Sequence, residues 1–299
     1  MRILNYHRRA ASGDGGITNS VRVLSKAMSR AGAEPIILSD DDAPPLPLPG
    51  VEWRQVHHRV SRGFAVPMSL EEALQGVDAV ILNSAWTLQN LIVGKACRRR
   101  GIPYVCAPRG AYDPEILARH GWGKRLWWMA GERRLVQHAS ALHIFFDSER
   151  EHMSALNFRG EVFAAPNGVA VPARWRWRQG GDYLLYLGRF DPEHKGLDTL
   201  LLGLAQTSPS EVPPLRMHGS DWAGGKQTVR QMVDEMGLGA RVVIGEPLSG
   251  DAKWEAFAGA RAFVYPSRWE AFGNSAAEAA AIGIPSLLTP YPLGRYLAD

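Results

Sequence analysis

The chain has 299 residues, of which 45% are apolar and 21% charged, and its formal charge is +4. This composition excludes a disordered or fibrous protein, and no apolar run reaches the roughly 18 residues that a membrane-spanning helix needs. The first 171 residues carry 21 Lys and Arg against 16 Asp and Glu. This excess favours an anionic partner such as an acidic lipid or a phosphorylated substrate, although a solvated basic face explains it equally well.

The first half alternates short β-branched or aromatic runs with amphipathic helical patterns. At the amino terminus the apolar run is short and charges follow it, so we expect no signal peptide. Cys97 and Cys106 have no metal-site spacing and predict buried thiols in a reducing compartment. Helical patterns ending in Gly lie at 18–32 and 87–101. The predicted strands are 2–7, 35–39, 51–57, 78–84, 103–108, 141–146 and 161–166.

A linker containing Pro and Gly precedes a second series of strands. These are predicted at 183–190, 214–220, 241–246, 262–267 and 285–289. Such alternation specifies parallel sheets that are covered by helices on both faces. We therefore predict two Rossmann-like, doubly wound α/β domains, 1–171 and 172–299, facing a central cleft. Ligands of such folds bind at the carboxyl ends of the strands, so the cleft is the expected site.

Two glutamates bracket the start of a predicted helix in the sequence RWEAFGNSAAEAAAIGIP. The amides of Gly273, Asn274 and Ser275 would have no acceptor within the helix, which makes an anion site suited to a diphosphate. Glu270 precedes this site and Glu278 follows it. Two carboxylates placed in this way could accept hydrogen bonds from the ribose and sugar hydroxyls of a nucleotide sugar. The alternative is an acid favoured by the helix dipole and a glutamate that faces solvent.

Cations and glycines suitable for phosphate binding occur at two strand ends. Arg189 and Lys195 lie in LGRFDPEHKG after a predicted strand, where they could clamp phosphates and offset charge on a departing diphosphate. Two solvated cations are the alternative. In SGDGGIT, Gly15 and Gly16 permit close approach of the backbone to a ligand.

These stretches resemble the retaining glycosyltransferases of family 4, which have the GT-B fold. GRFDPEHKG followed by the E-x7-E pattern in EAFGNSAAE is the specific part of the resemblance, and GDGGIT, PRGAYDPE and PNGV also fit. The resemblance implies that Glu270 contacts the transferred sugar and Glu278 the ribose. It also implies that Arg189 and Lys195 bind the diphosphate, and that the Gly15–Gly16 loop approaches the donor from the first domain.

The same resemblance implies a chemistry and a cellular role. Transfer would proceed with retention from a UDP- or GDP-sugar, with no metal and no other cofactor, by a front-face route for which no enzymic nucleophile is firmly established. Arg109 stands in PRG where many relatives have a histidine, as in a branch that builds cell-surface polysaccharides, and this suggests an acceptor-side role. Family members usually continue beyond the last residues of this sequence, so we expect the second domain to lack its final elements.

Other readings of the sequence compete with this one. Thr18 stands where a dinucleotide fingerprint needs its third glycine, which argues against an NAD enzyme. The acidic residues 40–42 match the D-x-D of metal-dependent transferases, but a solvated loop is the preferred interpretation. Residues 120–138 combine tryptophans with cations, which fits either a membrane-surface helix or tryptophans in a core. The RWRWR tract at 174–178 could stack on nucleic acid, lie at a membrane or pack between the domains.

We therefore expect a cytoplasmic hexosyltransferase. It would move a sugar from a nucleotide sugar to a lipid-linked or growing cell-surface glycan, in polysaccharide or lipopolysaccharide biosynthesis. Its partners would be the donor, the glycan or glycolipid acceptor and the anionic inner face of the membrane, and no nucleic acid is expected. The alternative is a truncated, non-catalytic relative that binds nucleotide sugar.

Overall fold

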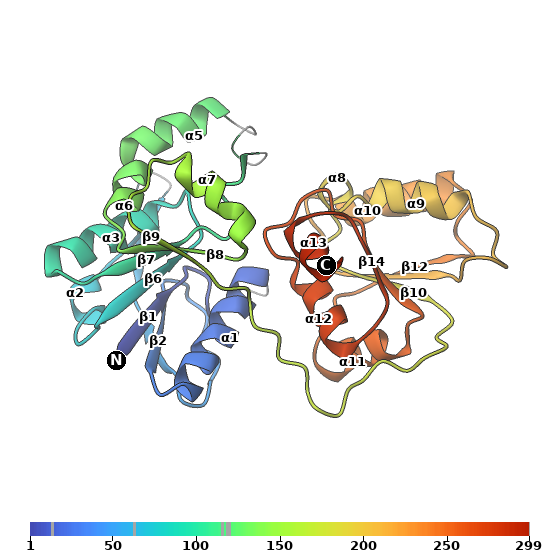
Figure 1. The fold of residues 1–299 in the computed structure, drawn as a ribbon, viewed down its shortest axis with the longest axis horizontal. Coiled ribbons are helices and arrows are strands. Elements are labelled where there is room, and N and C mark those ends of the chain that lie inside the picture. Colours follow the sequence, from blue (N-terminus) through green and yellow to red (C-terminus); the bar gives the residue numbers. More distant parts are fainter. Residues whose placement is uncertain (13–14, 62–63, 115–116, 118–120, 299) are drawn as a thin grey trace. The chain divides into compact units, whose positions relative to one another are not determined.

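A computed structural model describes residues 1–12, 15–61, 64–114, 117 and 121–298 (Figure 1). The chain divides into two compact units, Met1–Gly168 and Val169–Asp299, here called unit 1 and unit 2. Each unit is built on its own parallel sheet with helices around it. The prediction of two doubly wound α/β domains is confirmed.

Unit 1 contains a seven-stranded sheet in the order β3-β2-β1-β6-β7-β8-β9, with every neighbouring pair parallel. All seven predicted strands are present. They are β1 (Arg2–Tyr6), β2 (Glu34–Ser39), β3 (Glu52–Gln55), β6 (Ala79–Asn83), β7 (Tyr104–Ala107), β8 (Ala141–Ile144) and β9 (Glu161–Ala164). The helical elements are α1 (Gly16–Arg30), α2 (Leu70–Ala73), α3 (Leu88–Arg100), α5 (Gly121–Trp127), η1 (Trp128–Glu132), α6 (Arg133–Gln137), η2 (Asp147–Glu149) and α7 (Arg150–Ser154).

Both faces of this sheet are buried, because successive strand residues point to opposite sides. Leu4 of β1 belongs to a large apolar cluster that includes Val93 and Cys97 of α3. Its neighbour Ile3 belongs to a second cluster, against which Leu24 of α1 packs. Cys97 and Cys106 are both buried free thiols, as predicted.

An antiparallel hairpin of β4 (His58–Ser61) and β5 (Phe64–Pro67) was not predicted. It belongs to neither large sheet, and Val60 is 68% exposed. Its sequence lacks the alternation of apolar and polar residues that marks a strand of a core sheet.

Unit 2 contains a five-stranded parallel sheet in the order β12-β11-β10-β13-β14. Its strands are β10 (Leu184–Leu187), β11 (Leu215–His218), β12 (Val242–Gly245), β13 (Ala262–Tyr265) and β14 (Ser286–Leu288). Its helices are α8 (Pro192–Lys195), α9 (Leu197–Ala205), α10 (Gly225–Glu235), α11 (Gly250–Gly259), α12 (Asn274–Ile282) and α13 (Pro292–Ala298). The strand order reverses between β10 and β13, so ligands are expected where these two strands end.

The tryptophan-rich segment forms three consecutive helical elements, α5, η1 and α6, and η1 is a π-helix. Buried Glu132, at the end of η1, accepts hydrogen bonds from the amide of Trp86 (3.2 Å), Tyr112 (2.7 Å) and Trp127 (3.1 Å). Trp128 packs against Trp86 and Tyr112, whereas Trp122 is 78% exposed. The alternative of tryptophans in a core is therefore confirmed for Trp128 and not for Trp122, and contact with a membrane stays a prediction. In the part of the chain that is described, no helix is long and apolar enough to cross a membrane.

The RWRWR tract packs within unit 2. The indole of Trp177 donates to the carbonyl of Ala260 (2.8 Å), and its amide donates to Ile282 (3.1 Å). Arg174 and Arg178 pair with Asp251 and Glu255 of α11. These arginines therefore have acidic partners in their own unit.

The expectation of a solvated acidic loop at 40–42 is wrong for its first residue. Asp40 is fully buried and accepts a hydrogen bond from Tyr6 (3.2 Å). Asp41 accepts from the amides of Ala11 and Ser12 at 3.2 and 2.7 Å. These carboxylates fasten the loop after β1. Among the described residues, no group of three or more His, Cys, Asp or Glu could hold a metal ion.

Candidate active site

The carboxyl ends of β10 and β13 bring together residues that are far apart in the sequence. Arg189 follows β10, Lys195 ends α8, and Glu270 follows β13. Pro192 begins α8, and the Asp191 side chain caps it by accepting from the amide of His194 (3.2 Å). A fixed proline φ and a side-chain cap both favour a helix start here, and the short helix carries Lys195 toward the end of β13.

Glu270 and Lys195 form a buried ion pair, with 12% and 6% of their side chains exposed. The same carboxylate oxygen, Oε1, accepts hydrogen bonds from Tyr265 (2.9 Å) and Ser267 (2.8 Å). Lys195 also donates to the Tyr265 hydroxyl at 3.1 Å. Two of the residues that we predicted to be catalytic are therefore in direct contact within a shared hydrogen-bond network.

This network keeps the glutamate ionised. Burial by itself would raise the pKa of Glu270, but the charge and hydrogen bond of Lys195, with smaller effects from His194 and Ser267, lower it below its usual value. Burial and the charge of Glu270 raise the pKa of Tyr265 well above its usual value, so the hydroxyl stays protonated and can donate. The result is a buried carboxylate held in one position by several donors.

His194 completes the wall beside the pair. Its ring stacks on Trp269 with the centroids 4.3 Å apart, and its Nε2–H donates to the carbonyl of Trp269 (2.8 Å). Burial and the charge of Lys195 lower the pKa of His194, so the ring is neutral at pH 7. Its Nε2 lies 3.9 Å from Oε1 of Glu270.

Helix α12 begins immediately beyond Glu270. Its N-cap, Gly273, has φ +86° and has no side-chain cap. The helix bond from the amide of Ala277 to the carbonyl of Gly273 is 3.0 Å long, and the amides of Asn274 and Ser275 belong to the first turn of the helix. A Cβ at Gly273 would lie 3.1 Å from the ring of Tyr291 and 3.2 Å from its hydroxyl. Both the backbone conformation and the packing therefore require glycine here.

Glu278 is held by another residue of unit 2. Its side chain is 13% exposed and pairs with Lys253 of α11 at 2.7 Å. The alternative of a solvent-facing glutamate is therefore wrong. The E-x7-E spacing places the two acids in two separate ion pairs, Glu270 with Lys195 and Glu278 with Lys253.

Arg189 lies at the end of β10 with its guanidinium over the ring of Trp222, 4.4 Å from the ring centroid. Its carbonyl accepts from the Tyr186 hydroxyl (2.8 Å). The loops after β10 and β11 touch closely, because a Cβ at Gly219 would lie 1.7 Å from the carbonyl oxygen of Gly188. This contact holds Trp222 beside Arg189, the residue that we predicted to bind the diphosphate.

In unit 1 the predicted residues lie at the carboxyl ends of β1 and β7. Gly15 is the N-cap of α1 and Gly16 its first residue, and an added Cβ at Gly15 would meet nothing within 4 Å. The preceding Gly13 and Asp14 of SGDGGIT lie outside the described residues. Arg109 follows β7 and donates from Nε (3.1 Å) and Nη2 (2.6 Å) to the side-chain oxygen of Asn83.

Strained backbone is concentrated at this edge of unit 1. Ser84 and Trp86 follow β6 and Arg109 follows β7, and all three have positive φ, at 74°, 59° and 56°. Such conformations cost about 1–3 kcal/mol each for residues other than glycine, and they gather at ligand sites. Burial lowers the pKa of Arg109 to about 10, and burial together with the charge of Arg109 lowers that of His7 to about 4.

Sequence reasoning missed the hydrogen-bond partners of Glu270 and the residue that packs on Gly273. Tyr265 and Ser267 are at the end of a predicted strand, where side chains meet in a parallel sheet, and that position was the available signal. Tyr291 is 5% exposed, and its hydroxyl has no hydrogen-bond partner among the described residues. The sequence carries no local signal for Tyr291, because its contact with Gly273 depends on the path of the chain after β14.

Two family models match the chain. Residues 15–168 match the glycosyl transferase 4-like domain, and residues 171–297 match the glycosyl transferases group 1. No curated protein matches the sequence.

Several solved structures share the fold at low sequence identity. Sucrose-phosphate synthase from Thermosynechococcus elongatus matches with a TM-score of 0.76 and 19% identity, over 100% of this chain and 83% of that chain. Anabaena HepE in complex with UDP and glucose matches with a TM-score of 0.76 and 16% identity, over 100% and 83% of the two chains. WaaG, a glycosyltransferase involved in lipopolysaccharide biosynthesis, matches with a TM-score of 0.72 and 16% identity, over 100% and 84%.

These neighbours confirm the GT-B fold that the resemblance implied. One family model covers more than half of the chain, and the other covers nearly all of the remainder. The chain therefore belongs to the glycosyltransferases that combine a glycosyl transferase 4-like domain with a group 1 domain.

Proposed function

We propose that this glycosyltransferase moves a hexose-type sugar from a UDP- or GDP-linked donor, with retention, to a lipid-linked or growing cell-surface glycan. The observation that carries the proposal is the buried Glu270–Lys195 pair at the strand-order reversal of unit 2, beside the start of α12. A charged pair in this position combines an acceptor for sugar hydroxyls with a cation for phosphate.

The donor lies along the carboxyl edge of unit 2. Its diphosphate accepts hydrogen bonds from the amides of Gly273, Asn274 and Ser275 at the start of α12. Lys195 and Arg189 bind the same diphosphate through their charge. Glu270 accepts from the sugar hydroxyls, and Glu278 accepts from the ribose while keeping Lys253 as its second partner. The existence of Anabaena HepE structures with UDP and with UDP-glucose, in the same fold, supports a donor of this class.

Transfer needs charge stabilisation at the leaving group. The bond from the anomeric carbon to the diphosphate oxygen breaks, the acceptor oxygen bonds to the same face of that carbon, and the departing diphosphate takes the acceptor proton. Arg189, Lys195 and the dipole of α12 offset the charge that develops on the diphosphate. In this proposal they fill the role that a divalent cation has in other transferases, and Gly15 and Gly16 are donor-binding residues of unit 1.

The acceptor binds to unit 1, where Arg109 and the strained edge around it form the recognising surface. Trp122, Leu126 and Met129 are 78%, 53% and 67% exposed, and their spacing places them on one face of the α5–η1 segment. Exposed aromatic and aliphatic side chains in a basic helical segment favour contact with an anionic membrane surface. We therefore assign the enzyme to the cytoplasmic face of the membrane. Solved structures of lipopolysaccharide glycosyltransferases with the same fold support such a pathway.

Calorimetric binding of UDP, GDP and ADP to the full chain tests the donor site. One nucleotide should bind, and Glu278→Ala should weaken it by about tenfold, which is the usual effect of losing a hydrogen bond to a charged group. Glu255→Ala is the matched control, because it also removes an ion pair from α11. If no nucleotide binds to the folded chain, the proposal is wrong. If nucleotide binds but no sugar nucleotide is turned over, the chain is a binding relative without transfer activity.

A further inference from the structure

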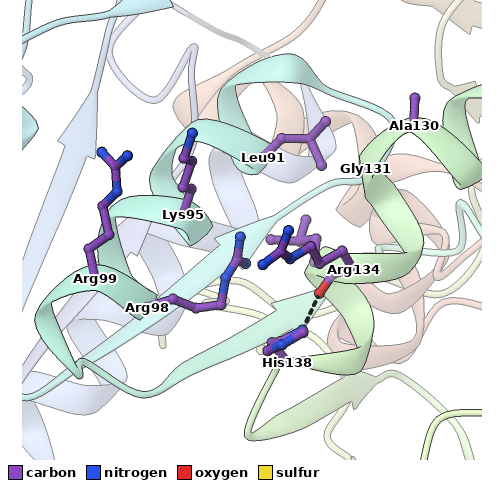
Figure 2. A pocket seen from close by; sticks show the side chains of 9 residues that line it. Leu91, Lys95, Arg98, Arg99, Ala130, Gly131, Arg134 and His138 are labelled. Carbon is purple, nitrogen blue, oxygen red and sulfur yellow. Dashed lines mark hydrogen bonds between the residues drawn. The ribbon is translucent and has the colours of Figure 1, made fainter.

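A pocket of about 440 Å³ lies in unit 1, between α3 and the η1–α6 segment (Figure 2). Four cations and a histidine line it, together with apolar side chains and a glycine. The charged and titratable residues are Lys95, Arg98, Arg99, Arg134 and His138. The volume is in the range of pockets that hold small ligands.

The charge of this pocket is not balanced by acids. No Asp or Glu lines it. Within the described part of the chain, no carboxylate lies within ion-pair distance of any of the four cations. Elsewhere the arginines often have acidic partners, as Arg174 and Arg178 do. In Figure 2 the guanidinium groups of Arg98 and Arg134 point toward each other, and two such cations repel unless an anion joins them.

A buried tyrosine holds Arg98 in position. Its Nη1 donates to the hydroxyl of Tyr104 (3.1 Å), and that hydroxyl donates to the carbonyl of Leu135 (2.7 Å). Tyr104 is 1% exposed, so a buried side chain orients the guanidinium. On the other wall, the ring Nδ1 of His138 donates to the carbonyl of Arg134 (2.9 Å), as Figure 2 shows. A group oriented before binding loses less conformational entropy when it binds a ligand.

Two glycines keep the walls of the pocket close together. A Cβ at Gly94 would lie 2.3 Å from Leu135, and a Cβ at Gly131 would lie 2.7 Å from Leu91. The helices therefore touch below the charged rim, and the cations project from both walls of a fixed groove.

The pocket is distinct from the edge that carries Arg109. Arg98 and Arg99 lie in the last turn of α3, shortly before β7 begins, and His138 lies just before β8. These positions are at the amino ends of the two strands, whereas Arg109 follows the carboxyl end of β7. An anion bound here does not occupy the acceptor surface proposed above.

We propose that this pocket binds the phosphate group of an anionic ligand, either a phospholipid headgroup or a free phosphate compound. Arg98 and Arg134 supply planar, multi-donor guanidinium groups suited to phosphate oxygens, and Lys95 adds a point charge at the rim. The exposed side chains of Leu126 and Met129 precede the pocket wall in the sequence, so a lipid could contact them while its headgroup lies in the pocket.

The test compares two pairs of substitutions with the same loss of charge. Arg98→Gln with Arg134→Gln removes two of the three guanidinium groups that line the pocket, one from each wall. Arg100→Gln with Arg133→Gln changes exposed neighbours that do not line it. Each variant is titrated with inorganic phosphate by calorimetry, and is sedimented with phosphatidylcholine vesicles with and without phosphatidylglycerol. We expect the pocket pair to weaken binding about tenfold or more and the outer pair less than about twofold.

The two probes separate the two sources of phosphate. A pocket-specific loss with inorganic phosphate supports a soluble ligand, and one that occurs only with phosphatidylglycerol vesicles supports a lipid headgroup. Equal losses in the two pairs, or binding of neither probe, overturn the proposal. Arg98→Gln also removes a hydrogen bond to Tyr104. If the Arg98→Gln, Arg134→Gln variant has a lower melting temperature, Lys95→Gln with Arg134→Gln replaces it in the comparison.

Discussion

The carboxyl edges of the two sheets are built differently. In unit 2, Glu270 and Lys195 compensate each other's charge, and a regular helix start lies beside them. In unit 1, Arg109 contacts the neutral amide of Asn83 and lies over the ring of Phe145, with its Cζ 5.2 Å from the ring centroid. Its backbone is strained, as is that of Ser84 and Trp86.

This difference indicates two kinds of ligand site. A compensated pair stays stable before the ligand arrives and can exchange one partner for a phosphate or a hydroxyl. A half-buried guanidinium without an ion-pair partner among the described residues, held by strained backbone, suits a ligand that accepts hydrogen bonds. The first arrangement suits a charged donor and the second an acceptor rich in hydroxyl oxygens.

The largest expected effect is on turnover. Glu270→Gln should lower kcat by about a hundredfold or more, because the neutral amide stabilises developing positive charge on the sugar less well. It should also destabilise unit 2 by about 3–5 kcal/mol, since Lys195 is left buried without its counter-charge. Steady-state assays with the sugar nucleotide and thermal unfolding would measure the two effects.

A double variant separates these effects. Lys195→Met combined with Glu270→Gln removes both charges, so it should regain much of the stability while turnover stays low. Recovery of turnover together with stability would mean that Glu270 acts only through folding.

The next effect concerns the donor. Lys195→Ala should weaken nucleotide binding by about tenfold and leave the KM for the acceptor unchanged, because it removes the proposed charged contact to the diphosphate. Lys226→Ala is the matched control, a second buried lysine of unit 2 that pairs with Glu246. Equal weakening of donor and acceptor would contradict the diphosphate assignment.

The corresponding substitution in unit 1 should weaken binding of the acceptor. Arg109→Gln should raise the acceptor KM by about fivefold, through loss of charged hydrogen bonds, and leave nucleotide affinity unchanged. Ser84→Gly at the same edge should instead stabilise the protein by about 1 kcal/mol, because glycine adopts a positive φ without strain. A change in nucleotide affinity in Arg109→Gln would show that donor binding is not confined to unit 2 and acceptor binding to unit 1.

A separate effect is a dependence of stability on pH in unit 1. Burial lowers the pKa of both His7 and His143 to about 4, with Arg109 the next cause for each. Between pH 6.5 and 4 the unfolded chain therefore binds more protons than the folded chain, so the free energy of unfolding falls as the pH falls. Histidine NMR titration should find both rings neutral above about pH 5. A ring that titrates near pH 6.5 would contradict the burial argument.

Much of the fold could be predicted because it is encoded locally. Parallel strands with both faces buried leave continuous apolar runs, and glycine marks the ends of α3 and α12. The hairpin of β4 and β5 escaped prediction because the sequence of β4 shows neither a continuous apolar run nor a regular alternation of apolar and polar residues.

The candidate site was predictable in its residues but not in its contacts. The helix-start pattern at Gly273 indicated an anion site from the sequence alone. The pairing of Lys195 with Glu270 joins residues 75 positions apart, and it depends on β10 and β13 being neighbours. From the sequence we expected Glu278 to contact the ribose. Its ion pair with Lys253 was not predicted, because nothing in the sequence shows that α11 packs beside α12.

The stacking of Arg189 on Trp222 has a practical consequence. The indole is half exposed, and a cation lies over its face. A diphosphate that draws the guanidinium away would change the surroundings of the ring, and with them its fluorescence. The enzyme therefore carries a native optical probe at its proposed donor site, and loss of the signal in Trp222→Phe would identify the source. Nucleotide arrival could then be followed on the timescale of mixing, without a labelled sugar.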